Sequence, residues 1–188
     1  IFLRVCGIDF QSDDFNSFLN SWWSIIKLND FTGLATQVGN YNIPYQVIIY
    51  LMTLLPLNAL YAYKIVSIIF DFALAISTAM LVYSFAKNNR RFKAILTYSA
   101  VLLSATVIFN SSFWAQCDSI YTSFIILAIL FLHKDKPIAS FVFIGIAFAF
   151  KLQTVFIIPV LLYYWISTKK ISILHFFIIP AGDVVMGL

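Results

Sequence analysis

The stretch NSSFWAQCDSIY, residues 110–121, is the polar segment around which the rest of the chain is organised. It lies between two long apolar runs and carries three polar side chains of interest, Asn110, Gln116 and Asp118. A short polar break between apolar runs of helical length is typical of a connection between two membrane helices. We therefore expect residues 110–121 to lie at one membrane surface.

The composition indicates an integral membrane protein. Of the 188 residues, 62% are hydrophobic and 11% are charged, whereas a soluble domain is about half apolar and about a quarter charged. The net charge of +4 does not indicate a nucleic-acid partner, because the basic residues fall in loops between apolar runs, where they report orientation. The sequence predicts an all-α, polytopic transmembrane helical bundle in the cell membrane, with the lipid bilayer as a partner and no nucleic acid.

Residues 1–188 are expected to form a single transmembrane domain. The chain begins without Met and ends within an apolar run, so we expect a segment of a longer protein, truncated at both ends. Residues 7–63 are predicted to form an outer loop that precedes the membrane helices of residues 64–188. Within this loop, Phe15–Ile26 has apolar residues at helical spacing, which predicts an amphipathic helix lying in the membrane interface.

The apolar runs that follow differ in length. Ile65–Ala86 is long enough to span a membrane, since about 20 apolar residues cross the hydrocarbon core. The runs near the C-terminal end are short for full crossings and are open to a re-entrant interpretation. One helix from 138 to 166 would be about 43 Å long, against a core of about 30 Å. A break is therefore expected at Lys151–Gln153.

Charge distribution predicts the orientation of the chain. The loops 87–93, 134–136 and 169–170 hold eight of the twelve basic residues and one acid, Asp135. By the positive-inside rule these loops are cytoplasmic, so the alternate loops face outward. The run Ile43–Leu57 decides whether the acidic N-terminal region shares that outer face. Its two prolines and its short length favour a position along the interface, which places Asp13, Asp14 and Asp118 on the same side.

Two acidic stretches hold candidates for chemistry. Asp13 and Asp14 either cap the helix that begins near Phe15 or supply a general base that takes a proton from a hydroxyl. Asp118, likewise, either caps the helix beginning near Ile120 or contacts a substrate. A Mg²⁺ or Mn²⁺ site built from these three carboxylates is possible, because such metals prefer oxygen ligands. We predict neither a metal nor another cofactor.

Two cations stand on the predicted outer face, where cations are scarce. Lys151 interrupts an apolar run and Lys64 begins one. Such lysines either extend to the headgroups or bind a phosphate as a point charge. Asp71 lies inside the predicted span 65–86, where an ionisable group is costly and is usually paired or functional. A structural partner on a neighbouring helix and a direct role are both open for Asp71.

Four motifs occur together and in order: SDDFxxFLxxW at 12–22, GNYNxPY at 39–45, NSSxWxQxDSIY at 110–121 and FKLQ at 150–153. Together they resemble the bacterial polytopic glycosyltransferases related to the eukaryotic GPI-anchor mannosyltransferases, which belong to the GT-C class. Two motifs depart from the family pattern. Its Trp-Gly-Gln reads Trp114-Ala115-Gln116 here, and its Tyr-Pro-Pro-like segment reads Asn42-Ile43-Pro44.

The resemblance implies an inverting hexosyltransferase that uses a polyprenyl-phosphate sugar donor and a glycan or lipid acceptor at an extracytoplasmic site, for cell-surface glycan or glycolipid synthesis. It implies Asp14 as the catalytic base, with Asp13 as the alternate. We expect Lys151 and Lys64, with Arg4, to stabilise the donor phosphate. The other predicted substrate-binding residues are Gln153, Gln116, Asp118, Asn110, Asn42 and Trp114.

Two alternatives remain beside the transferase. A transporter or flippase for lipid-linked sugars also needs polar outer loops and an intramembrane acid such as Asp71. It predicts polar residues that continue across the bilayer, whereas here they cluster on the predicted outer face. A non-catalytic scaffold subunit predicts that Lys151 and both Asp13 and Asp14 tolerate substitution.

Overall fold

The computed structural model describes the backbone of residues 2–35, 37–39, 41–168 and 171–185, and side chains as far as residue 181. All regular structure in these ranges is helical, which confirms the predicted all-α class. The predicted basic loop 169–170 lies outside the described residues.

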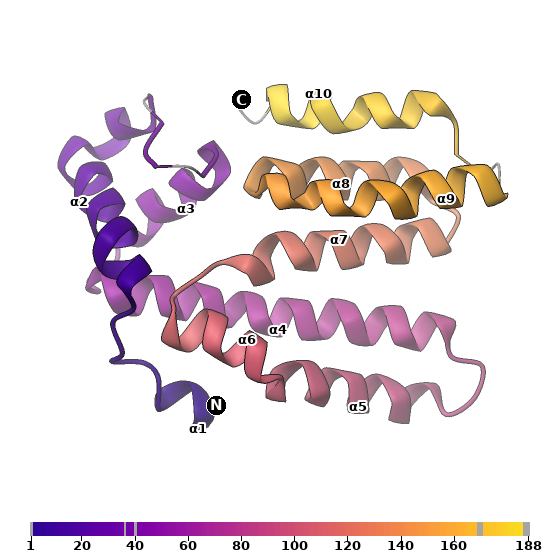
Figure 1. Cartoon of the computed structure of the whole chain (residues 1–188), viewed down its shortest axis with the longest axis horizontal. Helices are drawn as coiled ribbons and strands as arrows, with labels where there is room; N and C mark the ends of the chain where they lie inside the picture. Colours follow the sequence, from indigo (N-terminus) through magenta and orange to yellow (C-terminus); the bar gives the residue numbers. More distant parts are fainter. Residues whose placement is uncertain (1, 36, 40, 169–170, 186–188) are drawn as a thin grey trace.

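The helices of the bundle lie side by side (Figure 1). They are α4 (Ala59–Phe85), α5 (Arg90–Leu103), α7 (Asp118–His133), α8 (Pro137–Phe150), α9 (Ile158–Thr168) and α10 (Ile178–Val185). The other helices connect or precede them: α1 (Phe2–Val5), η1 (Phe15–Leu19), α2 (Asn20–Asn29), η2 (Asp30–Ala35), α3 (Ile43–Thr53), α6 (Ala105–Ile108), η3 (Phe109–Phe113), η4 (Leu152–Ile157) and η5 (Ile173–Phe177).

Helix α4 is the central helix and packs against both α5 and α7. It begins after Asn58, whose side-chain oxygen accepts a hydrogen bond from the Tyr61 amide at 2.9 Å. Its buried face carries the polar residues Ser67, Asp71 and Ser77, whereas its exposed face carries large apolar side chains. The exposed set recurs at helical spacing and comprises Ile65, Ile69, Ile76, Met80 and Tyr83.

Among the described residues, α4 alone is a single helix long and apolar enough to cross a membrane, and 22% of its most apolar window is buried. A second candidate arises if α5 is joined to residues 105–113 across a 50° bend at Ser104. The apolar run 94–109 is therefore bent. Helices α7 and α8 are shorter, with 16 and 14 residues.

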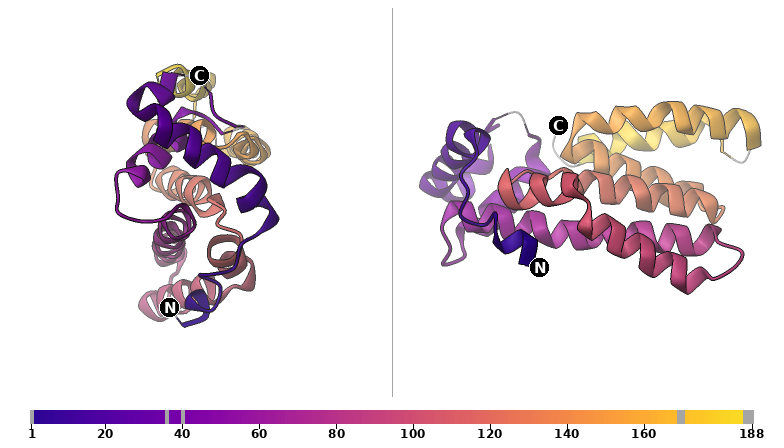
Figure 2. Two further views of the ribbon diagram at one scale, coloured as in Figure 1. Left: turned by 90° about the vertical axis from the view of Figure 1, so that its left-hand side faces the viewer. Right: turned by 60° about the horizontal axis from the view of Figure 1, so that its bottom comes forward.

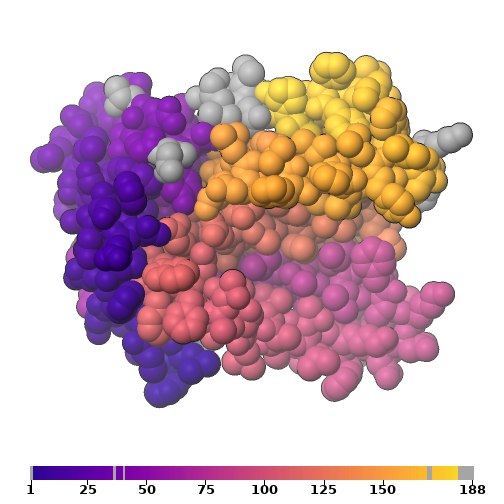
Figure 3. Space-filling model, in the orientation of Figure 1, coloured from indigo at the N-terminus to yellow at the C-terminus, as the bar shows by residue number. Residues whose placement is uncertain are grey.

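The N-terminal region covers one end of the bundle (Figure 2, left). The predicted amphipathic helix is present as η1 and α2, and it buries one apolar face, formed by Phe15, Leu19, Trp22, Trp23 and Ile26. That face packs against the protein, with the Trp23 and Tyr63 rings 6.0 Å apart between centroids. The space-filling view shows this region at one end, with α9 and α10 along one flank and α5 toward the other (Figure 3).

Helix α3 decides how the two acidic stretches lie relative to each other. It has 11 residues, begins with Pro44 in its first turn, and packs on α2 at the covered end of the bundle (Figure 1). Helix α7 begins at the same end, whereas the loops 87–93 and 134–136 lie at the opposite end. Asp14, which bonds Gln116, and Asp118, which starts α7, therefore lie at the same end of the bundle, as two residues on one membrane side require.

The predicted break between the last apolar runs is also present. Helix α8 ends at Phe150, and Lys151 has an extended backbone with φ −156° and ψ 127°. The chain then turns into η4 and α9. This turn aims the segment 151–156 toward the covered end of the bundle, where the candidate site is found.

Candidate functional site

A pocket of about 670 Å³ lies between the N-terminal region and the turn at Lys151. It brings together segments that are far apart in the sequence, including all four motifs quoted above. Its polar lining residues are Asp14, Tyr41, Asn42, Gln116, Lys151 and Gln153, and its apolar walls are Phe18, Leu19, Trp22, Phe150, Leu152, Val155 and Phe156.

Asp14 reaches the pocket from the first turn of the helix that continues as η1 and α2. The helix is capped by Ser12, not by an aspartate, since the Phe15 amide donates to the Ser12 hydroxyl oxygen at 3.1 Å. Ser12 Oγ in turn donates to the Trp114 carbonyl at 3.2 Å, which ties this helix to the 110–121 stretch. The capping interpretation of Asp13 and Asp14 is therefore wrong, and Asp14 is free for another role.

Gln116 orients the Asp14 carboxylate. Its Nε2 donates to Asp14 Oδ2 at 2.8 Å, and its Oε1 accepts from the Tyr41 hydroxyl at 3.1 Å. A carboxylate only accepts hydrogen bonds, so the amide must present its nitrogen to Asp14 and its oxygen to Tyr41. Burial raises the pKa of Tyr41 well above its usual range, so the hydroxyl keeps the proton that it donates. No hydrogen bond from the described residues reaches Asp14 Oδ1.

Residue 115 sets the direction in which Gln116 points. Ala115 is fully buried and has φ +58°, a left-handed conformation that favours glycine. The turn is held by two backbone hydrogen bonds, from the Gln116 amide to the Asn110 carbonyl at 2.8 Å and from the Ala115 amide to the Ser111 carbonyl at 3.2 Å. Within Trp114-Ala115-Gln116, residue 115 is therefore the position where glycine is geometrically preferred.

Lys151 supplies the positive charge of the pocket. Its ammonium forms an ion pair with Asp118, and it lies 5.4 Å and 5.7 Å from the ring centroids of Tyr41 and Tyr121. The other Asp118 oxygen accepts from Asn110 Nδ2 at 3.0 Å. Asp118 is the first residue of α7, and its carboxylate bonds the side chains of Asn110 and Lys151, not a backbone amide of the helix. The capping interpretation of Asp118 is therefore wrong, and this residue instead fixes the position of Lys151.

Lys64 does not line the pocket. Its side chain is completely buried, and its ammonium donates to three backbone carbonyls, those of Gly7 at 2.6 Å, Ile8 at 3.0 Å and Phe10 at 2.5 Å. All three N–H donors of the ammonium are thereby used. The structure corrects the expectation that Lys64 binds phosphate: this residue fastens the segment 7–10 to α4.

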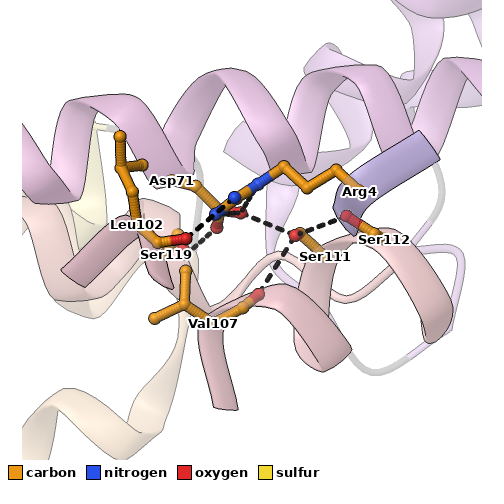
Figure 4. Close-up of polar contacts among 7 residues, drawn as sticks. All are labelled: Arg4, Asp71, Leu102, Val107, Ser111, Ser112 and Ser119. Atoms are coloured by element: carbon orange, nitrogen blue, oxygen red, sulfur yellow. Dashed lines mark hydrogen bonds and ion pairs between the residues drawn. The ribbon is translucent and has the colours of Figure 1, made fainter. Parts of the chain in front are cut away.

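Arg4 does not line the pocket either, and Figure 4 shows the contacts that it makes instead. Its guanidinium donates to Asp71 Oδ2 from Nε at 3.1 Å and from Nη2 at 3.0 Å, and from Nη1 to the Leu102 carbonyl at 2.9 Å. Asp71 also accepts from Ser111 Oγ and Ser119 Oγ, both at 2.6 Å. The expected phosphate contact of Arg4 is replaced by a structural pair, which supplies the partner anticipated for Asp71.

The remaining predicted residues divide into two groups. Asn42, Gln116 and Gln153 line the pocket, whereas Asp13, Asn110 and Trp114 do not. The aromatic wall was missed, although Tyr41 lies inside one of the quoted motifs. Among the described residues, no three His, Cys or Asp side chains lie close enough to hold a metal ion, so Asp13, Asp14 and Asp118 are not gathered as ligands.

The two cysteines give a direct test of packing at this site. Cys117 is buried beside Tyr41 and Tyr45, and burial raises the pKa of its thiol to about 11. Cys6 is exposed. Because the thiolate is the reactive form, N-ethylmaleimide at pH 8 in mild detergent is expected to label Cys6 and spare Cys117, as read by mass spectrometry of the peptides. Equal labelling of both thiols in the folded protein would contradict this packing.

The left-handed residue gives a second test. Ala115→Val is expected to destabilise the protein by about 2 kcal/mol or more, because a β-branched residue is poorly tolerated at positive φ. Ala115→Gly is expected to be nearly neutral, since relief of about 1–2 kcal/mol of left-handed strain offsets the loss of a buried methyl worth about 0.8 kcal/mol. Thermal melting in detergent distinguishes the two, and equal losses in both variants would contradict the assigned turn.

Comparison of the chain with protein-family models, with curated proteins and with solved structures finds no match.

Proposed function

We propose that this chain is a membrane glycosyltransferase, mannosyltransferase-like, that transfers a hexose from a polyprenyl-phosphate-linked donor to a glycan or lipid acceptor on the outer face of the cell membrane. The observation that carries this proposal is the placement of Asp14 and Lys151 on the walls of one pocket. Sugar transfer from a phosphate requires a base that takes the proton of the acceptor hydroxyl and a cation that stabilises the leaving phosphate.

The surface of α4 supports a membrane location. In a soluble protein apolar side chains point inward, whereas α4 buries Ser67, Asp71 and Ser77 and exposes Ile69 and Ile76. Polar groups that are satisfied inside a bundle, with apolar groups outside, suit a helix surrounded by lipid. The basic loops 87–93 and 134–136 lie at the end of the bundle opposite α2, whose Trp22 lines the pocket, which supports a multi-pass domain with an extracytoplasmic site.

The chemistry proposed for the pocket is a single displacement. Asp14 Oδ1 takes the proton of the acceptor hydroxyl, and the hydroxyl oxygen attacks the anomeric carbon as the bond from that carbon to the phosphate oxygen breaks. The configuration inverts, and polyprenyl phosphate leaves with the bonding electrons. Lys151 uses one N–H on Asp118, so two further donors remain for the phosphate, whose charge grows in the transition state.

The amides support this arrangement. Gln153 and Asn42 line the pocket and offer both donors and acceptors to sugar hydroxyls. Trp22 and Phe156 offer apolar faces beside them. Gln116 acts through Asp14, since its hydrogen bond fixes one carboxylate oxygen and leaves the other directed to the acceptor.

The proposal is tested with the chain in lipid nanodiscs, supplied with labelled polyprenyl-phosphate hexoses and a panel of saccharide and lipid acceptors. Transfer of label to an acceptor, with release of polyprenyl phosphate, is the expected result. Transbilayer movement of intact donor in liposomes would favour the flippase alternative, and absence of donor binding would favour the scaffold. The bonding of Asp71 to Arg4, Ser111 and Ser119 gives the flippase no free intramembrane acid at this position.

A further inference from the structure

A second hollow, of about 610 Å³, lies between α4 and α5, toward the ends of these helices that are joined by the loop 87–89. On α4 its lining residues recur every three or four positions, from Ile76 to Ser84, and on α5 they include Arg90, Ala94 and Tyr98 at intervals of four. Each helix therefore presents a single face to this groove.

Small side chains explain why the groove is not filled. Ala79 on α4 and Ala94 on α5 both line it and end at Cβ. Larger apolar side chains, among them Met80 and Ile95, form its walls and are exposed at its rim. The groove is therefore lined largely by apolar side chains, as a hydrocarbon chain requires, and is called the slot below.

Two cations stand at the polar end of the slot. Arg90 begins α5, and its Nε donates to the Ala86 carbonyl at 2.7 Å, which holds the guanidinium in place and leaves its two Nη atoms without a hydrogen bond to the described residues. Lys134 contributes the second charge from the end of α7. No acidic residue is among the described lining residues, and the hydroxyls of Tyr83 and Tyr98 add two donors.

We propose that this groove is a specific site for an anionic phospholipid of the membrane leaflet on the basic side. An acyl chain occupies the apolar slot, and the lipid phosphate lies between Arg90 and Lys134. A basic pocket beside membrane helices on the cytoplasmic side suits an anionic headgroup. The site rests on the membrane location in the proposed function but not on sugar transfer, because the groove lies beside the loop 87–89, at the end of the bundle opposite α2 and α3.

The test uses the delipidated full chain in detergent and native mass spectrometry with phosphatidylglycerol or phosphatidylcholine of identical acyl chains. One phosphatidylglycerol is expected to bind at least about tenfold more tightly than phosphatidylcholine. Arg90→Gln and Lys134→Gln are each expected to weaken its binding about fivefold. Ala94→Leu, which fills the slot and keeps both charges, is expected to abolish it. Thermal melting of each variant checks that the protein is folded.

The matched control is Arg91→Gln, which removes the same charge from the neighbouring position of α5. Arg91 is exposed and is not part of the groove lining, so its replacement is expected to leave binding unchanged. Three results would overturn the proposal: equal affinity for the two lipids, equal weakening by Arg90→Gln and Arg91→Gln, or displacement of the lipid by millimolar inorganic phosphate. Since the readout is lipid binding, failure of sugar transfer is distinguishable from failure of this site.

Discussion

Asp14→Asn is expected to lower the rate of sugar transfer by about a hundredfold to ten-thousandfold, the usual contribution of a positioned general base. Asparagine keeps the shape of the side chain and an oxygen that accepts the Gln116 hydrogen bond, but it does not take a proton from the acceptor. Donor affinity is expected to change little, because Lys151 and Gln153, which are proposed to bind the donor, still line the pocket in this variant. Steady-state transfer and equilibrium donor binding in nanodiscs measure the two effects separately.

Two further variants define what this result means. Asp30→Asn removes one charge from the same N-terminal region outside the pocket, keeps the shape of the side chain, and is the matched control. Asp13→Asn tests the neighbouring carboxylate, which is exposed and does not line the pocket. Loss of transfer in Asp13→Asn with normal transfer in Asp14→Asn would overturn the assignment of the base.

Most of the correct predictions about the fold came from helical periodicity and from the distribution of charge. The apolar spacing from Phe15 to Ile26 predicted a one-sided helix, and the length limit of a membrane core predicted the break at Lys151. The alternation of loops between the two membrane faces predicted that Asp14 and Asp118 lie on one side, and both lie at one end of the bundle. The bend at Ser104 was missed, because a serine within an apolar run carries no breaker signal comparable to proline.

The candidate site was less predictable, because distance along the sequence does not report which charges meet. Lys64 and Lys151 looked equivalent as outer-face lysines, yet the carbonyls of Gly7, Ile8 and Phe10 occupy all of the donors of Lys64. Arg4 was expected to bind phosphate, but its guanidinium forms an ion pair with Asp71. These two assignments depend on long-range contacts that neither hydropathy nor local spacing encodes.

Asp71→Asn is expected to destabilise the protein by about 3–5 kcal/mol, the usual cost of removing one partner of a buried ion pair. Arg4 and Asp71 are 4% and 0% exposed, so the variant leaves the guanidinium buried without its counter-charge. The same carboxylate binds Ser111 of η3 and Ser119 of α7 (Figure 4), so these helices are expected to loosen together. A fall in melting temperature on the order of 10 °C in mild detergent is the expected measurement.

The double variant Arg4→Gln, Asp71→Asn separates the ion pair from the hydrogen bonds around it. Both charges are removed, while amides remain to bond the two serine hydroxyls and the Leu102 carbonyl. Because replacing a whole buried pair costs far less than breaking it, the double variant is expected to be more stable than Asp71→Asn alone. Stability losses in the two single variants that simply add in the double variant would contradict this coupling, and would mean that the N-terminal helix α1 is held to α4 by packing and not by charge.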